Sequence, residues 1–288
     1  EALRVVLVGD STTFGWGVGD SDTYAAELQR LLTYNHPTRR IDVVNAGVSG
    51  YDLAHQASLL TSLIPTLRPD VVLVGVHHED LRSERTPGPV FSFVPEEARW
   101  NWLSRTSRVA QVARQAWTDD LGLSSDVSEQ RRWEQSMLSG EQSKATDEAW
   151  SELERQLRRI QGLGQANQFD VGVVTMPMYS QVASGASPLL YQGRIRTVAE
   201  RLALFVADPL PGFLAQPDRT TLFIPFDHAH FSRVGYAEVA SVAADALRSR
   251  FDALPRPVDL LTSTTAVGAP GTPAAPVAPV SPAVPTVR

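Results

Sequence analysis

An α/β fold, with a parallel sheet covered by helices on both faces, is the architecture that the sequence predicts. Five short apolar runs rich in β-branched residues recur along the chain, with helical patterns between them. The runs are Leu3–Val8, Ile41–Val44, Val71–Val76, Val171–Thr175 and the weaker Leu204–Ala207. Such continuous runs are typical of strands buried on both faces, which occur in parallel sheets. Because helices separate the strands, we expect right-handed βαβ crossovers.

The first helix is expected to follow the polar residues Asp20–Asp22. These residues supply candidate N-caps and a favourable negative charge for the positive end of the helix dipole. Leu28, Leu31 and Leu32 would then face the sheet, and Asn35–Pro37 would end the helix.

The domain is expected to close with a helix at about Val234–Phe251. Apolar residues recur there on a helical period, and Arg248 and Arg250 suit the negative end of the helix dipole. From Pro255 to Arg288 the composition shifts to Pro, Ala, Val and Thr without any periodicity. We therefore expect one domain over residues 1–254, followed by a Pro/Ala-rich disordered tail over residues 255–288.

A helical cap is expected as an insertion at about residues 84–165. Three helical patterns fall in it, at Arg99–Trp117, Ser128–Leu138 and Thr146–Leu163. It also contains the tryptophans Trp100, Trp102, Trp117, Trp133 and Trp150. They are expected chiefly to hold the cap to itself and to the sheet, and a second interpretation is that one or two of them line an acyl or sugar pocket.

Composition excludes several classes of function. With 26 Lys and Arg against 32 Asp and Glu, the net charge of −6 offers no broad cationic field, so we expect no nucleic-acid partner. The absence of cysteine excludes disulfides and thiolate chemistry. No apolar run approaches the roughly 20 residues that span a bilayer. The chain begins at Glu1, so a signal or anchor outside this sequence, and a secreted or tethered protein, remain open expectations.

A serine after the first strand is the candidate nucleophile. Gly9-Asp10-Ser11 directly follows a buried run, at the carboxyl end of a parallel strand, where reactive groups gather in open α/β sheets. A second Gly-Asp-Ser occurs at Gly19–Ser21, but it precedes a helix and is explained as a cap. Context therefore selects Ser11.

A late acid–imidazole pair supplies what a serine nucleophile needs. A hydroxyl requires a base within hydrogen-bond reach, and the base must be oriented by a third group. Asp227 and His230 stand three residues apart just before the closing helix, so Asp227 can orient His230 and stabilise the imidazolium. His228 has the wrong spacing and is given a structural or substrate-edge role.

Taken in order, these motifs resemble the sequence blocks of the GDSL/SGNH hydrolase family. The blocks are Gly9–Ser11, Asn45–Gly50, an acidic segment after the third strand, and Asp227–His230. The resemblance covers about Leu3–Leu81 and Val171–Phe251. It implies a flavodoxin-like three-layer αβα sandwich with a five-stranded parallel sheet, and ester chemistry through an acyl-enzyme. It also implies an oxyanion hole made of the Ser11 amide, the Gly50 amide and an asparagine side chain.

The third block departs from the family pattern. It reads Gly-Val-His-His-Glu-Asp-Leu over Gly75–Leu81, which places Glu79 where the asparagine should be. Losing one oxyanion donor costs about 10²–10³ in turnover. Three explanations remain open: Glu79 is protonated and donates, His77 or His78 donates in its place, or the domain has kept binding and lost catalysis.

Two other classes of protein compete with the hydrolase interpretation. One is a metallohydrolase, in which His77, His78, Glu79, Asp80, His228 and His230 would hold a divalent metal. Against it, adjacent histidines on an extended segment would point to opposite faces. The other is a non-catalytic module that binds acylated glycans or peptides. A dinucleotide loop is disfavoured because Gly15-x-Gly17-x-Gly19 lacks the required spacing.

The sequence therefore predicts a serine hydrolase that cleaves or transfers an acyl ester. Ser11 would attack, His230 would move the proton, and Asp227 would hold the imidazole. Gly50, His77, His78 and Glu79 are the expected oxyanion and substrate-binding residues. We expect a small-molecule or glycan ester carrying a short acyl group such as acetyl, and no cofactor or metal. Nothing in the sequence indicates an oligomeric state.

Overall fold

Five parallel strands form the centre of the fold in the computed structural model, which describes residues 2–81, 125–184, 190–225, 227 and 229–253. The strand order is β2-β1-β3-β4-β5. The strands are β1 Leu3–Gly9, β2 Ile41–Gly47, β3 Val71–Val76, β4 Asp170–Thr175 and β5 Phe205–Ala207. All four neighbouring pairs are parallel. The prediction of a parallel α/β sheet is therefore confirmed.

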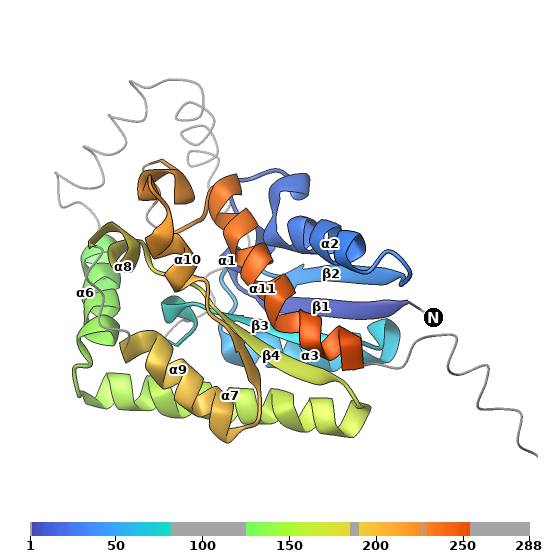
Figure 1. Cartoon of the computed structure of the whole chain (residues 1–288). Helices are drawn as coiled ribbons and strands as arrows, with labels where there is room; N and C mark the ends of the chain where they lie inside the picture. The colour runs from blue at the N-terminus through green and yellow to red at the C-terminus, as the bar shows by residue number, and fades with distance from the viewer. Residues whose placement is uncertain (1, 82–124, 185–189, 226, 228, 254–288) are drawn as a thin grey trace, which may run out of the picture. The chain divides into compact units, whose positions relative to one another are not determined.

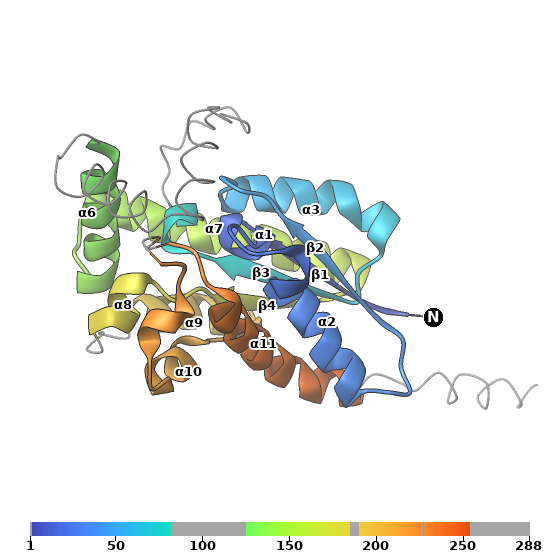
Figure 2. The same cartoon turned by 90° about the horizontal axis from the view of Figure 1, so that it is seen from above.

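Helices cover both faces of the sheet. Those of four residues or more are α1 Ser11–Phe14, α2 Tyr24–Asn35, α3 Leu53–Leu67, α6 Ser125–Ser139, α7 Lys144–Asn167, α8 Tyr179–Ser184, α9 Leu190–Arg201, α10 Leu210–Ala215 and α11 Arg233–Ala253. Short 3₁₀ turns are η1 Asp20–Asp22, η2 His78–Leu81 and η4 Arg219–Leu222. Figure 1 labels these elements, and Figure 2 shows α3 on one side of the sheet and α2 and α11 on the other. The three-layer αβα sandwich is thus present.

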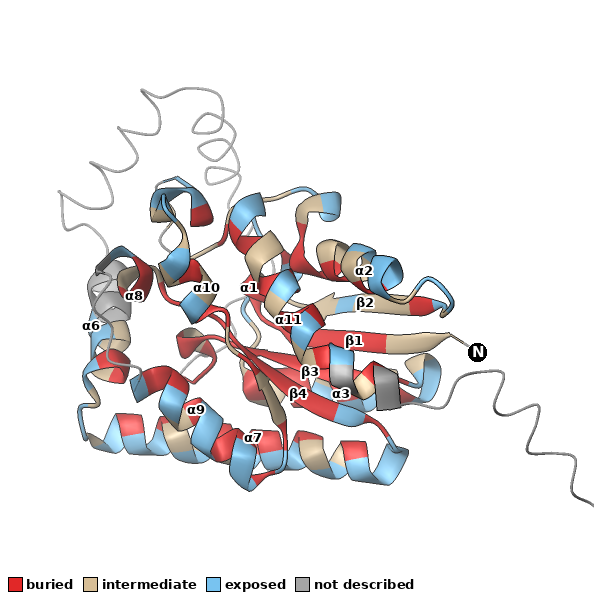
Figure 3. Ribbon diagram, in the orientation of Figure 1, coloured by how far each residue is buried: buried red, intermediate tan, exposed pale blue. Residues whose placement is uncertain are grey.

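Burial follows from the apolar runs. Every residue of β3 is buried, as are the last five residues of β1. One core cluster joins these strands to the apolar faces of α3, α7 and α9, and Figure 3 shows the buried strands between partly exposed helices. Strands enclosed on both faces need no polar alternation, which is why the sequence showed continuous apolar runs.

The strand order creates a switch point beside β1. The chain passes from β1 to β2 on one side and then returns across β1 to β3 on the other. Crossovers that leave in opposite directions open a crevice at the carboxyl ends of the strands, where ligands bind in open α/β sheets. Asp10, the residue after β1, and Ser11, the first residue of α1, lie at this crevice.

The open edge of β2 is covered by a side chain. The Gln29 amide of α2 donates to the Ile41 carbonyl at 2.7 Å, and its oxygen accepts from the Val43 amide at 2.7 Å. Further along, the Asn45 side chain accepts from the Gly47 amide at 3.0 Å. These contacts occupy backbone groups through which an edge strand would otherwise pair with another chain.

Two details differ from the sequence prediction. The cap of α2 is Thr23, whose hydroxyl accepts from the Ala26 amide at 3.2 Å, while Asp20–Asp22 forms η1 just before it. The second difference concerns α7, which falls within the predicted cap at residues 84–165 but packs against α3 and β4 as the crossover from β3 to β4. The layer on this face therefore includes α7.

Other predicted features lie partly or wholly outside the described residues. The pattern at Arg99–Trp117 and the tail at residues 255–288 are among them. Within the described part of the chain, no helix combines the length and the apolarity that crossing a membrane requires.

Candidate active site

Ser11 opens a short helix at the carboxyl end of β1. The buried carboxylate of Asp10 caps this helix by accepting from the Thr12 amide at 2.8 Å and from the Thr12 hydroxyl at 2.6 Å. The Ser11 amide is the first N–H of α1, and no acceptor for it is recorded among the described residues. Unpaired amides at a helix N-terminus attract negative charge.

Helix α1 lies directly on three strand glycines. A Cβ at Gly9 or Gly75 would overlap the Thr13 hydroxyl. A Cβ at Gly47 would lie 2.7 Å from the Thr13 carbonyl carbon and against the Phe14 amide. The glycines come from β1, β3 and β2 respectively, so the absence of side chains there determines how closely the nucleophile helix approaches the sheet.

Asp227 and His230 lie on a closed loop before α11. The Ile224 amide donates to the His230 carbonyl at 3.0 Å, and the Asp227 amide donates to the Ile224 carbonyl at 2.9 Å. Phe223 and Phe231 flank the loop as an antiparallel bridge with ring centroids 5.3 Å apart. Buried aromatic rings thus support the loop that presents the imidazole.

The structure brings Ser11, His230 and Asp227 together in hydrogen-bonding order. His230 Nε2 lies 2.9 Å from Ser11 Oγ, and His230 Nδ1 lies 2.9 Å and 3.1 Å from the two Asp227 carboxylate oxygens. One of these oxygens also accepts from the Ala229 amide at 3.0 Å and from the His230 amide at 3.1 Å. Both the backbone and the carboxylate therefore fix the orientation of the imidazole.

The environment keeps Asp227 ionised. Burial by itself would raise the pKa of this carboxyl, but the hydrogen bond and charge of His230 and the amides of Ala229 and His230 together lower it below the ordinary value of 3.8. Burial raises the pKa of the neighbouring Tyr236 phenol, and the carboxylates of Asp10 and Asp227 raise it further. The negative charge beneath His230 therefore resides on carboxylates, and the phenol stays neutral.

Gly50 lies on a loop tied to the end of β1. The Val48 amide donates to the Gly9 carbonyl at 3.0 Å, and Tyr51 closes the turn by donating to the Val48 carbonyl at 3.1 Å. Gly50 has φ +82°, which L side chains rarely adopt. Its amide has no recorded acceptor within the described part of the chain. These contacts hold the Gly50 loop beside the residue that precedes the nucleophile helix.

The histidines of the third block face each other. His78 Nδ1 lies 3.0 Å from His77 Nε2, and the ring centroids are 4.1 Å apart. The expectation that they point to opposite faces is wrong, because His78 begins η2 and the backbone is no longer extended. His77 Nδ1 lies 3.6 Å from Asp10, so both nitrogens of this ring face protein groups.

The rest of the third block is held by a hydrogen bond within the block and by one from α6. Asp80 accepts from the His77 amide at 2.9 Å, and the Trp133 indole donates to the His78 carbonyl at 2.8 Å. His77 and His78 are buried, whereas Glu79 is partly exposed. Within the described ranges, which exclude His228, no group of three or more His, Asp or Glu side chains is arranged to hold a metal ion.

The tryptophans divide between packing and the site. Trp133 and Trp150 of the predicted cap pack against the core cluster, and Trp150 also lies under Arg194. Trp100, Trp102 and Trp117 fall outside the described residues. Sequence reasoning missed Trp16, whose ring centroid lies 6.1 Å from that of His230. Its position five residues after the nucleophile was the available signal.

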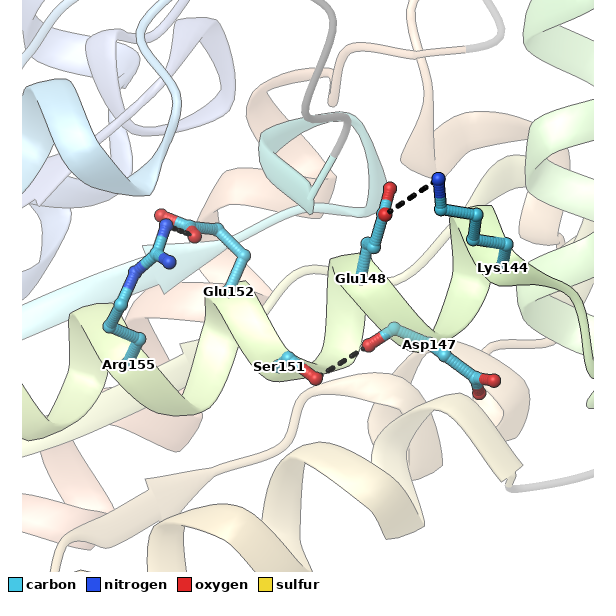
Figure 4. A pocket seen from close by; sticks show the side chains of 6 residues that line it. All are labelled: Lys144, Asp147, Glu148, Ser151, Glu152 and Arg155. Atoms are coloured by element: carbon cyan, nitrogen blue, oxygen red, sulfur yellow. Dashed lines mark hydrogen bonds and ion pairs between the residues drawn. The ribbon is translucent and has the colours of Figure 1, made fainter.

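A hollow on α7 shares no described lining residue with the Ser11–His230 site. Its volume is about 660 Å³, and its described lining residues are Lys144, Asp147, Glu148, Ser151, Glu152 and Arg155. Figure 4 shows them on one helix, with Lys144 3.6 Å from Glu148, Arg155 paired with Glu152, and the Ser151 hydroxyl donating to the Asp147 carbonyl at 2.7 Å. None of these residues belongs to the Ser11–His230 arrangement.

A parallel α/β sheet that holds serine, imidazole and carboxylate in this order has the architecture of a serine hydrolase. The chain belongs to the GDSL-like lipase/acylhydrolase family, whose model matches residues 7–238. That range includes Ser11, Asp227 and His230. Membership of this family identifies the protein as a hydrolase of the kind that acts on acyl esters.

Solved structures share the fold at low identity. A family 3 carbohydrate esterase from Clostridium thermocellum is 18% identical, with a TM-score of 0.53 over 88% of this chain and 98% of that one. TesA is 14% identical, with a TM-score of 0.52 over 85% and 98%. The acetyl xylan esterase AlAXEase is 16% identical, with a TM-score of 0.50 over 85% and 100%. No curated protein matches the sequence significantly.

Proposed function

We propose that the protein is a serine esterase in which Ser11, His230 and Asp227 form the catalytic triad. The observation that carries the proposal is the pair of contacts on one imidazole, 2.9 Å from Nε2 to Ser11 Oγ and 2.9 Å from Nδ1 to Asp227. A hydroxyl within hydrogen-bond reach of an oriented imidazole is the arrangement that activates serine. The family match supports ester chemistry independently of this geometry.

In the acylation step, Ser11 Oγ attacks the ester carbonyl carbon while its proton passes to His230 Nε2. The carbonyl electrons move onto oxygen and form a tetrahedral oxyanion. When this intermediate collapses, the bond to the alcohol oxygen breaks, and His230 returns the proton to the departing alcohol. Asp227, which stays ionised because of its low pKa, stabilises the imidazolium throughout.

In the deacylation step, a water molecule or a second alcohol attacks the acyl-Ser11 ester. His230 removes the proton of the attacking oxygen and then gives it to Ser11 Oγ as the acyl group leaves. Hydrolysis and transfer therefore use the same residues and differ only in the acceptor. We propose hydrolysis as the main reaction and transfer to an alcohol as the alternative.

The proposed oxyanion hole consists of the backbone amides of Ser11 and Gly50. Neither has a recorded acceptor among the described residues, and the Val48–Gly9 hydrogen bond holds the Gly50 loop at the end of β1. His77 is poorly suited to donate to an oxyanion because both of its ring nitrogens face Asp10 and His78. We therefore propose the two backbone amides as the donors that stabilise the developing negative charge.

We propose a short acyl group, such as acetyl, on a small-molecule or glycan alcohol. Two proteins with the same fold support this choice by name, an acetyl xylan esterase and a carbohydrate esterase. Comparing acetyl, butyryl and octanoyl esters of one alcohol tests it, with the acetate expected to be turned over fastest.

An active-site probe tests the triad directly. A fluorophosphonate should label wild-type protein at Ser11, identified by peptide mass, and should fail to label Ser11→Ala. His230→Ala should be labelled far more slowly. Ser21→Ala, in the second Gly-Asp-Ser, is the matched control and should be labelled like wild type. If wild-type protein is neither labelled nor active on any ester, the proposal fails and the binding module becomes the better interpretation.

A further inference from the structure

An exposed tryptophan lies beside the proposed catalytic base. The Trp16 ring centroid is 6.1 Å from that of His230, and the ring planes are tilted by 39°. Trp16 is 40% exposed although indole rings are usually well buried. An exposed aromatic face next to His230 lacks the favourable free energy of apolar burial. A bound molecule that covers this face would supply it.

The surrounding loop holds Trp16 in place. Its amide donates to the Ser11 carbonyl at 3.1 Å, which ties it to the nucleophile helix. Gly15 and Gly17 flank it with φ of +95° and +84°, conformations that turn the chain sharply on both sides. Gly17 also packs so closely on Ile224 that a Cβ there would collide with its side chain. The backbone that carries the indole is thus tied to Ser11 and packs against the loop of His230.

The chemistry of the triad determines which part of an ester lies near this ring. The acyl carbon must contact Ser11 Oγ, and the carbonyl oxygen must point to the amides of Ser11 and Gly50. The alcohol oxygen must reach His230 Nε2, because His230 protonates it as it leaves. A side chain packed beside the imidazole is therefore placed to contact the alcohol part of the ester.

We propose that Trp16 is a specificity-determining residue for the alcohol part of the substrate, and that it contacts a flat ring, either a sugar or an aryl group. The inference rests on the proposed function, since it uses His230 as the proton donor. An indole offers a broad apolar face with an N–H at its edge, which suits a ring that is apolar on its face and polar at its rim. In transfer reactions, the same surface would hold the acceptor alcohol.

Acetate esters that differ only in their alcohol test this proposal. The kcat/KM values for ethyl acetate, 4-nitrophenyl acetate and an acetylated methyl xyloside would be measured for wild type, Trp16→Ala and Trp16→Phe. Trp16→Ala should lower kcat/KM about tenfold for one or both ring alcohols and leave ethyl acetate nearly unchanged. The two ring substrates distinguish an aryl group from a sugar. Trp16→Phe should recover most of the loss.

A second measurement separates the alcohol from the acyl group. All three acetates form the same acetyl-enzyme. Trp16→Ala should therefore leave the rate at which the acetyl-enzyme reacts with water unchanged. It should reduce the fraction of acetyl groups that is transferred to added methyl xyloside. Phe14→Ala is the matched control, because Phe14 is an aromatic residue of α1 that is 50% exposed. It should leave the ratio of ring acetate to ethyl acetate as in wild type.

Three outcomes would overturn the inference. Trp16→Ala could lower kcat/KM equally for all three acetates, which would show that the ring only supports His230. It could instead change the preference between ethyl acetate and ethyl butyrate, which would place Trp16 on the acyl side. Phe14→Ala could also match the effect of Trp16→Ala, which would remove the specific role. Absence of all ester turnover in wild type would instead overturn the proposed function itself.

Discussion

Two segments of this protein carry the same Asp-x-Ala-His sequence: Asp52–His55 at the start of α3, and Asp227–His230 on the loop before α11. In the first segment, the Asp52 carboxylate accepts from the His55 amide at 2.9 Å and contacts His55 Nδ1 at 2.8 Å. In the second segment, the Asp227 carboxylate makes the corresponding contacts at 3.1 Å and 2.9 Å. At the local level, the two acid–imidazole pairs are nearly equivalent.

Their surroundings differ. Asp52 is the N-cap of α3, and the His55 ring lies 5.2 Å from the Tyr51 ring, with no hydroxyl recorded at its Nε2 among the described residues. His230 Nε2, by contrast, lies 2.9 Å from Ser11 Oγ, a residue 219 positions earlier in the chain. The same short motif therefore caps a helix in one place and meets a nucleophile in the other.

The largest contrast is expected from removing each imidazole. His230→Ala should lower kcat for an acetate ester by about 10⁴-fold or more, because the serine hydroxyl loses its base. His55→Ala should leave kcat close to wild type, since the contacts of the His55 ring within the described part of the chain are with Asp52 and Tyr51. Steady-state kinetics on purified, folded variants measure both. Equal losses in the two variants would show that the pairs are not distinguished by the Ser11 contact.

Removing the negative charge of each acid should give the next largest contrast. In Asp227→Asn, the amide can present an N–H to the imidazole and stabilise the wrong tautomer, which should lower kcat by about 10⁴-fold with little change in fold. Asp52→Asn should retain activity and stability, because asparagine is also a good N-cap. A fully active Asp227→Asn protein would exclude Asp227 as the orienting residue.

Gly47→Ala tests how closely the nucleophile helix must approach the sheet. The new Cβ would press on the backbone of Thr13 and Phe14 and displace α1. A displacement of about 1 Å can cost about 100-fold in turnover. Gly162→Ala is the matched control, because nothing lies within 4 Å of its added Cβ in the exposed face of α7. Wild-type kcat in Gly47→Ala would show that α1 tolerates the shift.

Asp52→Ala should affect stability more than activity. Loss of the cap should lower the free energy of unfolding by about 1 kcal/mol. Chemical denaturation with urea measures this change, and ester turnover is followed in parallel. A large fall in kcat without a change in stability would mean that the Asp52–His55 pair takes part in the reaction.

The pH dependence of stability should give the smallest effect, because the burial of Asp227 partly offsets the contacts that lower its pKa. A lowered carboxyl pKa contributes stability that is complete above the unfolded value, near 3.8, and is lost as pH falls through the folded value. Asp227→Asn should therefore be less stable than wild type at neutral pH, and the difference should shrink in acid. Urea denaturation at several pH values measures it; a constant difference would contradict the assignment.

Local patterns predicted most of the fold. The five apolar runs correspond to the five strands of the described residues, and the closing helix expected at Val234–Phe251 was found at Arg233–Ala253. Context separates the two Gly-Asp-Ser copies, because Ser11 follows a buried strand whereas Ser21 precedes a helix. The prediction that His77 and His78 point to opposite faces was wrong, because the change from strand to 3₁₀ turn has no strong local signal.

The sequence by itself determined the set of chemical groups and the order of the elements that carry them. The reason is that the apolar pattern within each segment indicates its burial and its secondary structure. Only the tertiary structure decided which groups meet. The strand order, the three glycines beneath α1 and the loop before α11 bring His230 to Ser11 and to the exposed ring of Trp16. Contacts across more than two hundred residues depend on how all the intervening elements pack. No short sequence pattern specifies that packing.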